Sequence, residues 1–378
     1  MIEAGFWTAA LLLGYVYLGY PALIWIWARL RPRPVFRRDW QPSVSVLVAA
    51  HNEGPRIAAK IENLLGLDYP TDRLEILIGS DGSSDDTVAR AQAFESPALR
   101  VFAFPECRGK PAVLNDLVRT ARGEVLVMAD VRQIFDETAL RALVRPLADP
   151  AVGVVSGELV LSGPEAGTAV TQGIGVYWSY EKGIRRSESL VDSTVGVTGA
   201  IYAVRRALFR PLPEDTLLDD VLLPVWVTRQ GYRVLFEPGA LAFDRAAATS
   251  AEELTRKVRT IAGTFQLFVR ERWLLHPRTN RLWLQALSHK GLRLLAPALL
   301  AIAALTSVAL ASRPFYATAL GFQVLFYALA LAGALAGPTR VRLLDVPFTF
   351  CLLNWATVLA LVTLRRGHQG VTWRKAAA

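Results

Sequence analysis

The sequence contains little cysteine, and it contains no evident internal repeat or low-complexity segment. Only 2 of its 378 residues are cysteines: Cys107 in the polar middle of the chain and Cys351 in an apolar run. A disulfide scaffold is therefore not implied, because such scaffolds need several cysteine pairs in a short chain. The scarcity fits a reducing compartment such as the cytoplasm.

Charge is also absent from four long stretches. Residues 6–27 carry no charged side chain over 22 positions, and 294–311, 314–338 and 346–364 are similarly apolar. A helix needs about 20 apolar residues to cross a bilayer core. We therefore expect one N-terminal membrane helix within 1–30 and about three membrane segments within 286–365. The first run is too long for a removable signal peptide, lacks a preceding basic residue and has no evident cleavage site after it.

The remaining charge is unbalanced, with a formal net charge of +9. Nucleic acid would explain such a balance, but five arginines directly follow the first apolar run: Arg29, Arg31, Arg33, Arg37 and Arg38. Basic residues that follow membrane boundaries argue against nucleic acid as a partner and for a lipid bilayer. The positive-inside rule places the polar middle in the cytoplasm.

The C-terminal end does not follow this rule. Three spans after a cytoplasmic domain leave the last basic residues outside: Arg365, Arg366, Arg374 and Lys375. Either one segment is re-entrant or the rule is overridden, and both readings stay open. The segment that contains Asp345, Pro347 and Asn354 is the candidate for a re-entrant one.

The polar middle alternates apolar runs with helical patterns. Strands are predicted at 43–50, 74–80, 99–104 and 124–130, with helices after Pro55, after Ser83 and over 110–121. This alternation predicts an α/β fold with a largely parallel sheet. Ligands of such sheets bind beyond the carboxyl ends of the strands. His51–Glu53, Asp81 and Asp130 follow three of these strands, so they are expected to share one acidic edge.

An acidic edge in a basic, membrane-attached chain suits a divalent metal and a phosphorylated ligand. Mg²⁺ and Mn²⁺ prefer carboxylate and phosphate oxygens, and Asp130 at a strand end is the candidate ligand. A helix N-cap is the structural alternative for Asp130, and a strand-ending turn is the alternative for Asp81. Lys110 is a candidate phosphate partner, although an isolated lysine is commonly a solvated surface residue.

Two further patterns suggest catalysis. Asp219 and Asp220 form a carboxylate pair of the kind that takes a proton from a hydroxyl, with helix capping as the alternative. Arg256 and Arg259 lie three residues apart on one face of a predicted helix over 252–275. Guanidinium groups bind diphosphate well, and they also bind lipid headgroups at a membrane interface.

Seven segments in chain order resemble the membrane-integrated family 2 glycosyltransferases, which include cellulose, hyaluronan and chitin-oligosaccharide synthases and bacterial exopolysaccharide enzymes. The segments lie within 43–265 and read VAAHNE, SDGSSDDT, GKPAVLN, VMADVR, TGAIYAVRR, DDVLLP and RKVRT. The resemblance implies a GT-A fold with a donor half at 40–150, an acceptor half at 151–250 and interfacial helices at 251–285. It also implies a nucleotide-sugar donor, a divalent metal and inversion at the anomeric carbon.

The resemblance assigns roles residue by residue. Asp220 matches the catalytic base, with Asp219 beside it, and Asp130 matches the second acid of a metal-binding Asp-x-Asp motif. Gly199 and Thr260 fall at acceptor positions. The nucleotide-sugar positions are Ala50, Asn52, Glu53, Asp81, Lys110, Asp130, Arg256 and Arg259.

Two departures from the family pattern matter. Met128 replaces the first acid of Asp-x-Asp, which leaves Asp130 as the assigned metal ligand. The motif Gln-x-x-Arg-Trp reads Arg256 to Thr260 here, so the tryptophan that stacks on an acceptor sugar in polymerising relatives is Thr260. A missing tryptophan and a short set of spans argue against processive synthesis, although a dimer would compensate for the few helices.

The expected protein is a multi-pass enzyme of the bacterial inner membrane with a cytoplasmic catalytic domain. It transfers a sugar, from a UDP-sugar in the first instance, to a glycan or lipid-linked acceptor. A processive synthase that exports its polymer and a catalytically silent scaffold subunit are the alternatives. A second copy of the chain or export proteins are candidate partners.

Overall fold

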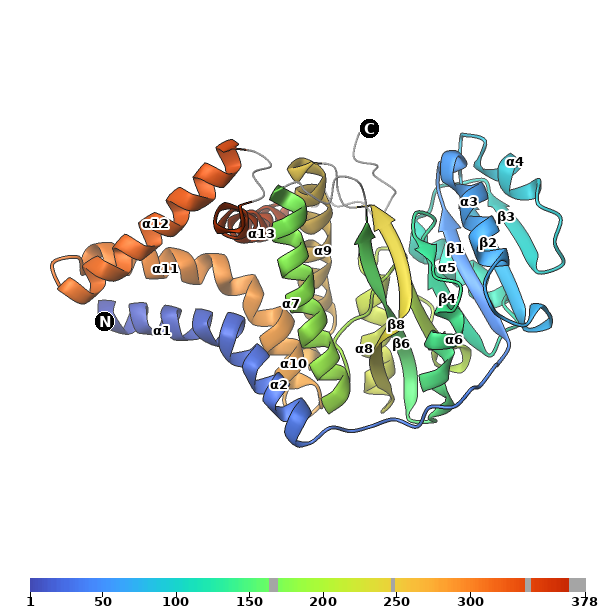
Figure 1. Ribbon diagram of the computed structural model, residues 1–378, viewed down its shortest axis with the longest axis horizontal. Helices are drawn as coiled ribbons and strands as arrows, with labels where there is room; N and C mark the ends of the chain where they lie inside the picture. The colour runs from blue at the N-terminus through green and yellow to red at the C-terminus, as the bar shows by residue number, and fades with distance from the viewer. Residues whose placement is uncertain (163–168, 246–248, 337–340, 367–378) are drawn as a thin grey trace. The chain divides into compact units, whose positions relative to one another are not determined.

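The computed structural model describes residues 1–162, 169–245, 249–336 and 341–366, which form two compact units. The α/β unit consists of the described parts of Pro32–Ser162 and Ser189–Arg245. The helical unit consists of the described parts of Met1–Arg31, Gly163–Glu188 and Ala246–Gln369. Figure 1 labels the elements of both units.

Within the described residues, the α/β unit contains one sheet of eight strands in the order β3-β2-β1-β4-β7-β6-β8-β5. The four strands predicted from the sequence are parallel neighbours, whereas β7 runs antiparallel to β4 and β6, and β5 runs antiparallel to β8. The sheet is therefore mixed, as the GT-A expectation requires. The strands are β1 Val44–Ala50, β2 Leu74–Asp81, β3 Leu99–Phe104, β4 Val125–Ala129, β5 Ile134–Phe135, β6 Val152–Ser162, β7 Ile201–Arg205 and β8 Arg233–Arg245.

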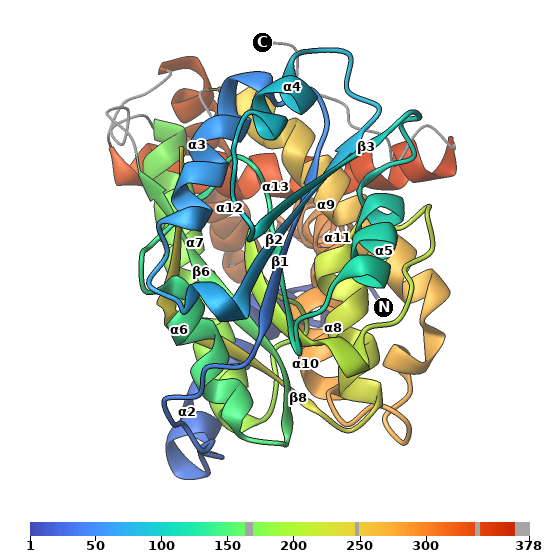
Figure 2. The same cartoon turned by 90° about the vertical axis from the view of Figure 1, so that its right-hand side faces the viewer.

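Helices cover both faces of this sheet, with α3 and α6 on one side and α5 and α8 on the other (Figure 2). Ile57 and Ile61 of α3 pack in one core cluster with the alternate β1 residues Val46 and Val48. On the other face α5 approaches so closely that a Cβ at Gly79 would lie 2.5 Å from Val113. The helices are α3 Gly54–Leu65, α4 Thr87–Gln92, α5 Lys110–Thr120, α6 Ala139–Val144 and α8 Asp219–Arg229, with 3-10 turns at Thr71–Arg73, Arg145–Ala148 and Arg206–Leu208.

Four helices among the described residues are long and apolar enough to cross a membrane: Ile2–Leu30, Trp283–Ala309, Pro314–Ala336 and Arg342–Arg365. One N-terminal and three C-terminal helices confirm the predicted number. The last helix is continuous through Pro347. The helical unit comprises α1 Ile2–Gly14, α2 Tyr20–Leu30, α7 Ala169–Val191 as far as Glu188, α9 Ser250–Arg270, α10 Trp283–Gln285, α11 Ala296–Ala309, α12 Pro314–Ala336 and α13 Arg342–Arg365, with π-helices at Tyr15–Gly19 and Ala286–Gly291 and 3-10 turns at Arg272–Leu275 and Leu292–Leu295.

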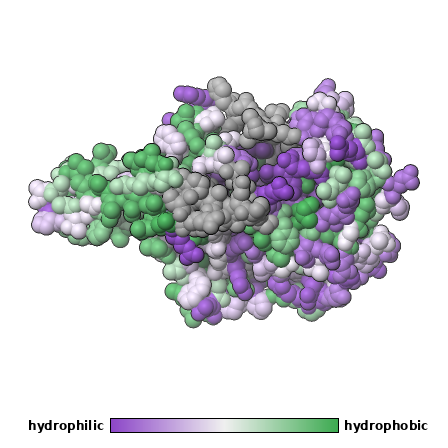
Figure 3. Space-filling model, turned by 45° about the horizontal axis from the view of Figure 1, so that its top comes forward, coloured by the Kyte–Doolittle hydropathy of each residue, from purple (hydrophilic) through white to green (hydrophobic). Residues whose placement is uncertain are grey.

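The surface of these apolar helices is strongly hydrophobic. Leu335 is 80% exposed and Phe322 is 70% exposed in the protein alone. Figure 3 shows the apolar side chains as a green surface at the left, where Figure 1 has α1, α11 and α12. An exposed apolar surface of this kind is typical of a contact with a membrane or with another protein, and it agrees with the four candidate membrane helices.

The first apolar helix is interrupted by a π-helical turn just before Pro21. Proline has no backbone N–H, so the carbonyl four residues earlier, that of Tyr17, loses its helical partner. The hydroxyl of Tyr180 in α7 donates a hydrogen bond to this carbonyl oxygen at 2.9 Å. A side chain of α7 therefore satisfies the backbone group that the proline releases.

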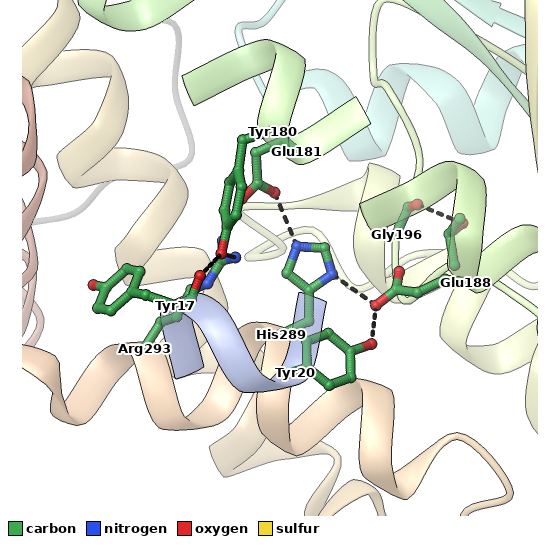
Figure 4. Close-up of polar contacts among 9 residues, drawn as sticks. Tyr17, Tyr20, Tyr180, Glu181, Glu188, Gly196, His289 and Arg293 are labelled. Atoms are coloured by element: carbon green, nitrogen blue, oxygen red, sulfur yellow. Dashed lines mark hydrogen bonds and ion pairs between the residues drawn. The ribbon is translucent and has the colours of Figure 1, made fainter. Parts of the chain in front are cut away.

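A buried ionic network joins α7 to two of the apolar helices (Figure 4). His289, in the π-helix Ala286–Gly291, lies between Glu181 and Glu188. Its ring nitrogens are 2.9 Å from Glu181 Oε2 and 2.8 Å from Glu188 Oε1. Tyr20 donates to Glu188 at 2.5 Å, and Arg293 pairs with Glu181. Burial alone would raise the pKa of Glu181, but Arg293 and His289 outweigh it and hold that pKa well below its usual value.

We expect His289→Phe to destabilise the protein by about 1–3 kcal/mol, because two buried carboxylates lose the hydrogen-bonding group between them. His276 of the same unit is exposed, so His276→Phe is the matched control and should unfold as the wild type does. Thermal unfolding of the detergent-solubilised chain measures both variants. Equal midpoints for His289→Phe and wild type would contradict a stabilising network.

Candidate active site

The register of the sheet brings the predicted acidic residues to one edge. Ala50 pairs with Ser80, and Val48 pairs with Ala129, so β1, β2 and β4 end side by side. Asp81 is the last residue of β2, and Asp130 directly follows β4. The antiparallel β7 begins at this same edge, where Ile201 pairs with Ala129, and this places Gly199 close by. The expected acidic edge is present.

The loop after β1 is fixed to the loop after β2. Asn52 has a positive φ of 51°, and its side-chain oxygen accepts a hydrogen bond from the Ser84 N–H at 2.8 Å. Glu53 pairs with Arg56 at 2.9 Å, and its N–H donates to Thr87 at 2.8 Å. Ala50, at the end of β1, is fully buried. These contacts shape the loop, and the predicted nucleotide-sugar contacts of Ala50, Asn52 and Glu53 stay predictions.

Asp81 is fully buried and holds the loop that precedes α5. Its carboxylate accepts hydrogen bonds from the backbone N–H groups of Arg108 at 2.8 Å and Gly109 at 2.7 Å. Gly82 has a φ of +59°, and a Cβ there would lie 2.7 Å from the Cys107 nitrogen. The close approach requires glycine. Asp81 thus places the start of α5, in addition to the nucleoside contact predicted for it.

Lys110, the first residue of α5, lies between two acids rather than in solvent. Its Nζ is 2.7 Å from Asp130 Oδ1 and 3.6 Å from Asp219 Oδ2. Burial would lower the pKa of Lys110, but Asp130 and Asp219 outweigh burial and raise it. The ammonium group therefore carries a fixed positive charge between two acids that the sequence separates by 89 positions.

Asp219 and Asp220 occupy the first turn of α8, directly after its N-cap residue Leu218. Asp219 is buried and also accepts a hydrogen bond from Tyr202 at 3.4 Å. The carboxylate of Asp220 lies against Gly199, where a Cβ would come within 2.8 Å of Oδ2. Gly199 therefore provides the space that the Asp220 side chain occupies.

Asp130 fits a divalent cation only as part of a larger set of ligands. Within the described residues, no group of three or more His, Cys, Asp or Glu side chains could hold a metal ion. Met128 is fully buried in β4, and the Asp130 side chain is 36% exposed. Mg²⁺ commonly binds one or two carboxylates plus substrate phosphates, so a single exposed carboxylate matches a cation that arrives with a diphosphate. No helix starts directly after Asp130, so helix capping does not explain it.

The remaining predicted residues belong to the helical unit. Arg256, Arg259 and Thr260 lie on α9, where Arg259 and Thr260 are exposed and Arg256 is 3.4 Å from Glu252. The helix begins with Thr249 as its N-cap, which accepts a hydrogen bond from the Glu252 N–H. The predicted diphosphate and acceptor contacts of these residues, and an interfacial position for α9, stay predictions.

Tyr202 is a site residue that the sequence analysis missed. It is fully buried, and burial together with Asp219 raises its pKa well above the usual value, so it stays a hydrogen-bond donor. Tyr202 stands three residues after Gly199 in the segment TGAIYAVRR. A tyrosine within the apolar run at 201–204 was the available signal.

A mixed sheet of this order, with acids and a lysine at the carboxyl ends of its parallel strands, defines a GT-A-type α/β domain. Residues 45–212 match the family described as Glycosyl transferase family 2. Over this region the chain is therefore similar to that glycosyltransferase family, and its described residues include four candidate membrane helices.

Curated relatives are similar over this region. The chain is 24% identical over 247 residues to a poly-beta-1,6-N-acetyl-D-glucosamine synthase of Staphylococcus aureus, covering 64% of this chain and 59% of that protein. It is 28% identical over 222 residues to the probable glycosyltransferase YdaM of Bacillus subtilis, covering 55% of this chain and 52% of that one. The matched region thus spans little more than half the length of these relatives.

A solved structure shares the fold along the whole chain. The mannosyltransferase PcManGT from Pyrobaculum calidifontis, in complex with GDP-Man and Mn²⁺, superimposes with a TM-score of 0.76. It is 24% identical, and the match covers 98% of this chain and 100% of that one. The similarity confirms the GT-A-type fold.

Proposed function

We propose that this chain is an inverting, metal-dependent glycosyltransferase of polysaccharide biosynthesis. It moves a sugar from a nucleotide-sugar, in the first instance a UDP-sugar, to a membrane-associated glycan or a lipid-linked acceptor. The observation that carries the proposal is the placement of Lys110 between Asp130 and Asp219, with Asp220 against Gly199, at one sheet edge. The family match and the named relatives support the reaction class.

The proposed chemistry is a single displacement. Asp220 takes the proton of an acceptor hydroxyl, and the acceptor oxygen forms a bond to the anomeric carbon on the face opposite the diphosphate. The bond between that carbon and the diphosphate oxygen breaks, and the nucleoside diphosphate leaves with the electron pair. The Lys110 ammonium lies where it can offset the negative charge of the leaving group, and Arg259 is a further candidate.

A divalent cation, Mg²⁺ or Mn²⁺, would be held by Asp130 together with diphosphate oxygens, and it would supply charge neutralisation for the leaving group. The solved structure that shares the fold contains Mn²⁺ with GDP-Man, so GDP-sugars belong in the donor test beside UDP-sugars. We further propose that the catalytic domain faces the cytoplasm, on the basis of the arginines after the first helix.

A donor screen tests this function. Purified full-length protein is incubated with UDP- and GDP-sugars and Mn²⁺, with Asp220→Asn as the control, and release of nucleoside diphosphate is measured. We expect release from one donor by the wild type and little by the variant. No release from any donor, with a folded protein, would favour a catalytically silent scaffold subunit.

A processive synthase is the second candidate, because a poly-beta-1,6-N-acetyl-D-glucosamine synthase is among the relatives. Thr260 in place of tryptophan and the three C-terminal helices favour a limited addition instead. Sizing of the product made from radiolabelled donor separates the two: a long polymer supports the synthase, and a single added sugar supports our proposal.

Gly199→Ala is expected to lower kcat about tenfold, because its Cβ would lie 2.8 Å from Asp220 Oδ2 and displace the proposed base. The KM for the donor should change little. Gly183→Ala is the matched control, since a Cβ at Gly183 meets no atom within 4 Å. Steady-state kinetics measures both variants, and an unchanged kcat in Gly199→Ala would argue against Asp220 as the base.

A further inference from the structure

Lys60 occupies a position in α3 that a helix facing a core normally gives to an apolar residue. It lies in the buried stripe with Ile57, Ile61 and Leu64, and all four side chains are fully buried. An ammonium group taken out of water is costly unless other groups compensate for the lost hydration. A lysine at such a position therefore calls for a specific role.

The Lys60 side chain contacts two residues that follow Asp130 in the sequence. Its Nζ donates a hydrogen bond to the backbone oxygen of Gln133 at 2.7 Å and lies 3.8 Å from the centre of the Phe135 ring. Among the residues that the structure describes, no carboxylate forms an ion pair with it within 4.0 Å. Burial lowers the pKa of Lys60 to about 7, and the negative charge of Asp130 opposes this shift.

Residues 130–135, here termed the Asp130 segment, are anchored at further points. The Asn63 side chain, one turn after Lys60, exchanges two hydrogen bonds of 2.8 Å with the backbone of Phe135. The Gln133 side chain donates to Asp244 of β8 at 2.6 Å. The segment that follows the candidate metal ligand is therefore held by α3 from one side and by β8 from the other.

We propose that Lys60 is a positioning residue that fixes the Asp130 segment and thereby sets the affinity of the site for a metal-bound nucleoside diphosphate. The inference rests on the proposed function, because it takes Asp130 as the residue that meets the metal and diphosphate. Lys60 acts through its hydrogen bond to the Gln133 carbonyl. Outer residues that orient a metal ligand are commonly worth about 10–100-fold in metal affinity.

The variant Lys60→Met tests this role, because methionine keeps the length and apolar stem of lysine but removes the N–H group that donates the hydrogen bond to Gln133. Binding of UDP and of GDP in the presence of Mn²⁺ is measured by calorimetry on the full-length protein in detergent. We expect the dissociation constant to rise about tenfold in Lys60→Met. The control Ile61→Ala removes packing from the same helix face but keeps the hydrogen bond between Lys60 and Gln133. It should therefore unfold at a lower temperature than the wild type, yet bind the nucleotides with wild-type affinity.

The outcomes separate the two proposals. If the wild type binds neither nucleotide with Mn²⁺, the proposed function fails, and this inference fails with it. If the wild type binds and Lys60→Met binds equally well, the positioning role alone is overturned. If Ile61→Ala weakens binding as much as Lys60→Met, the effect is general destabilisation, and the positioning role is likewise overturned.

The pH dependence of stability shows whether Lys60 is buried as described. Its pKa of about 7 in the folded protein lies below the ordinary lysine value of 10.5. Between these values the unfolded chain binds more protons, so unfolding becomes less favourable as pH rises. The charge that acts on Lys60 is that of Asp130. The Asp130 segment also carries Arg132, which lies 3.9 Å from Asp244. Wild type should therefore gain stability relative to Lys60→Met between about pH 7 and 10, and a constant difference would show that Lys60 is not buried.

Discussion

Replacement of Asp220 by asparagine is expected to lower kcat by a factor of about 10²–10⁴ and to leave nucleotide affinity unchanged. Asparagine keeps the shape of the side chain but cannot take a proton from the acceptor hydroxyl. Asp220 rather than its neighbour is assigned this role because the Asp219 carboxylate is buried and engaged by Lys110 and Tyr202. The Asp220 carboxylate lies against Gly199, in the segment predicted to meet the acceptor.

Asp219→Asn is the matched comparison, since the two acids are adjacent in the first turn of α8. Loss of the Asp219 charge should disturb Lys110 and therefore weaken donor binding, whereas Asp220→Asn should bind the donor normally. Steady-state kinetics gives kcat, and calorimetry with nucleoside diphosphate and Mn²⁺ gives affinity. Equal kcat for Asp220→Asn and wild type would remove Asp220 from the role of base.

Much of the fold could be predicted because apolar runs without interruption mark strands that are buried on both faces. All seven residues of β1 are buried, and so are seven of the eight in β2. The strand β8 was missed, because Pro238 and Gly239 divide it and its pairing with β6 contains register shifts. The two-residue β5 carries too little sequence for any pattern to reveal it.

The site was only partly predictable, for a related reason. Acids that follow parallel strands can be assigned to one edge from the sequence, and Asp81 and Asp130 do lie there. The contacts of Lys110 with Asp130 and Asp219 depend instead on packing between distant elements. Lys60 gave no signal either, because a lysine within a helical pattern normally faces solvent, and only the structure reveals it as fully buried.

Lys110→Met is expected to lower kcat/KM for the donor by a factor of about 10²–10³, because it removes the cation nearest to Asp130 and Asp219. The variant should also be less stable, since the buried Asp219 and the partly exposed Asp130 lose the positive charge that compensates them. Lys110→Arg keeps the charge with a different shape and should recover part of both losses.

The control for Lys110→Met comes from the same helix. Arg119 lies at the C-terminal end of α5 with a side chain that is 71% exposed, so Arg119→Met removes a positive charge without touching the acidic edge. It should retain wild-type kinetics and stability.

Donor kinetics and thermal unfolding distinguish the variants, and the salt dependence of nucleotide binding adds a further test. Because the Lys110 side chain is only 13% exposed and lies between two acids, its contribution should persist at high salt, whereas a solvated surface lysine would lose its effect. If Lys110→Met binds and turns over the donor as the wild type does, the ammonium group has no role in the reaction. The proposed arrangement of charges would then be wrong.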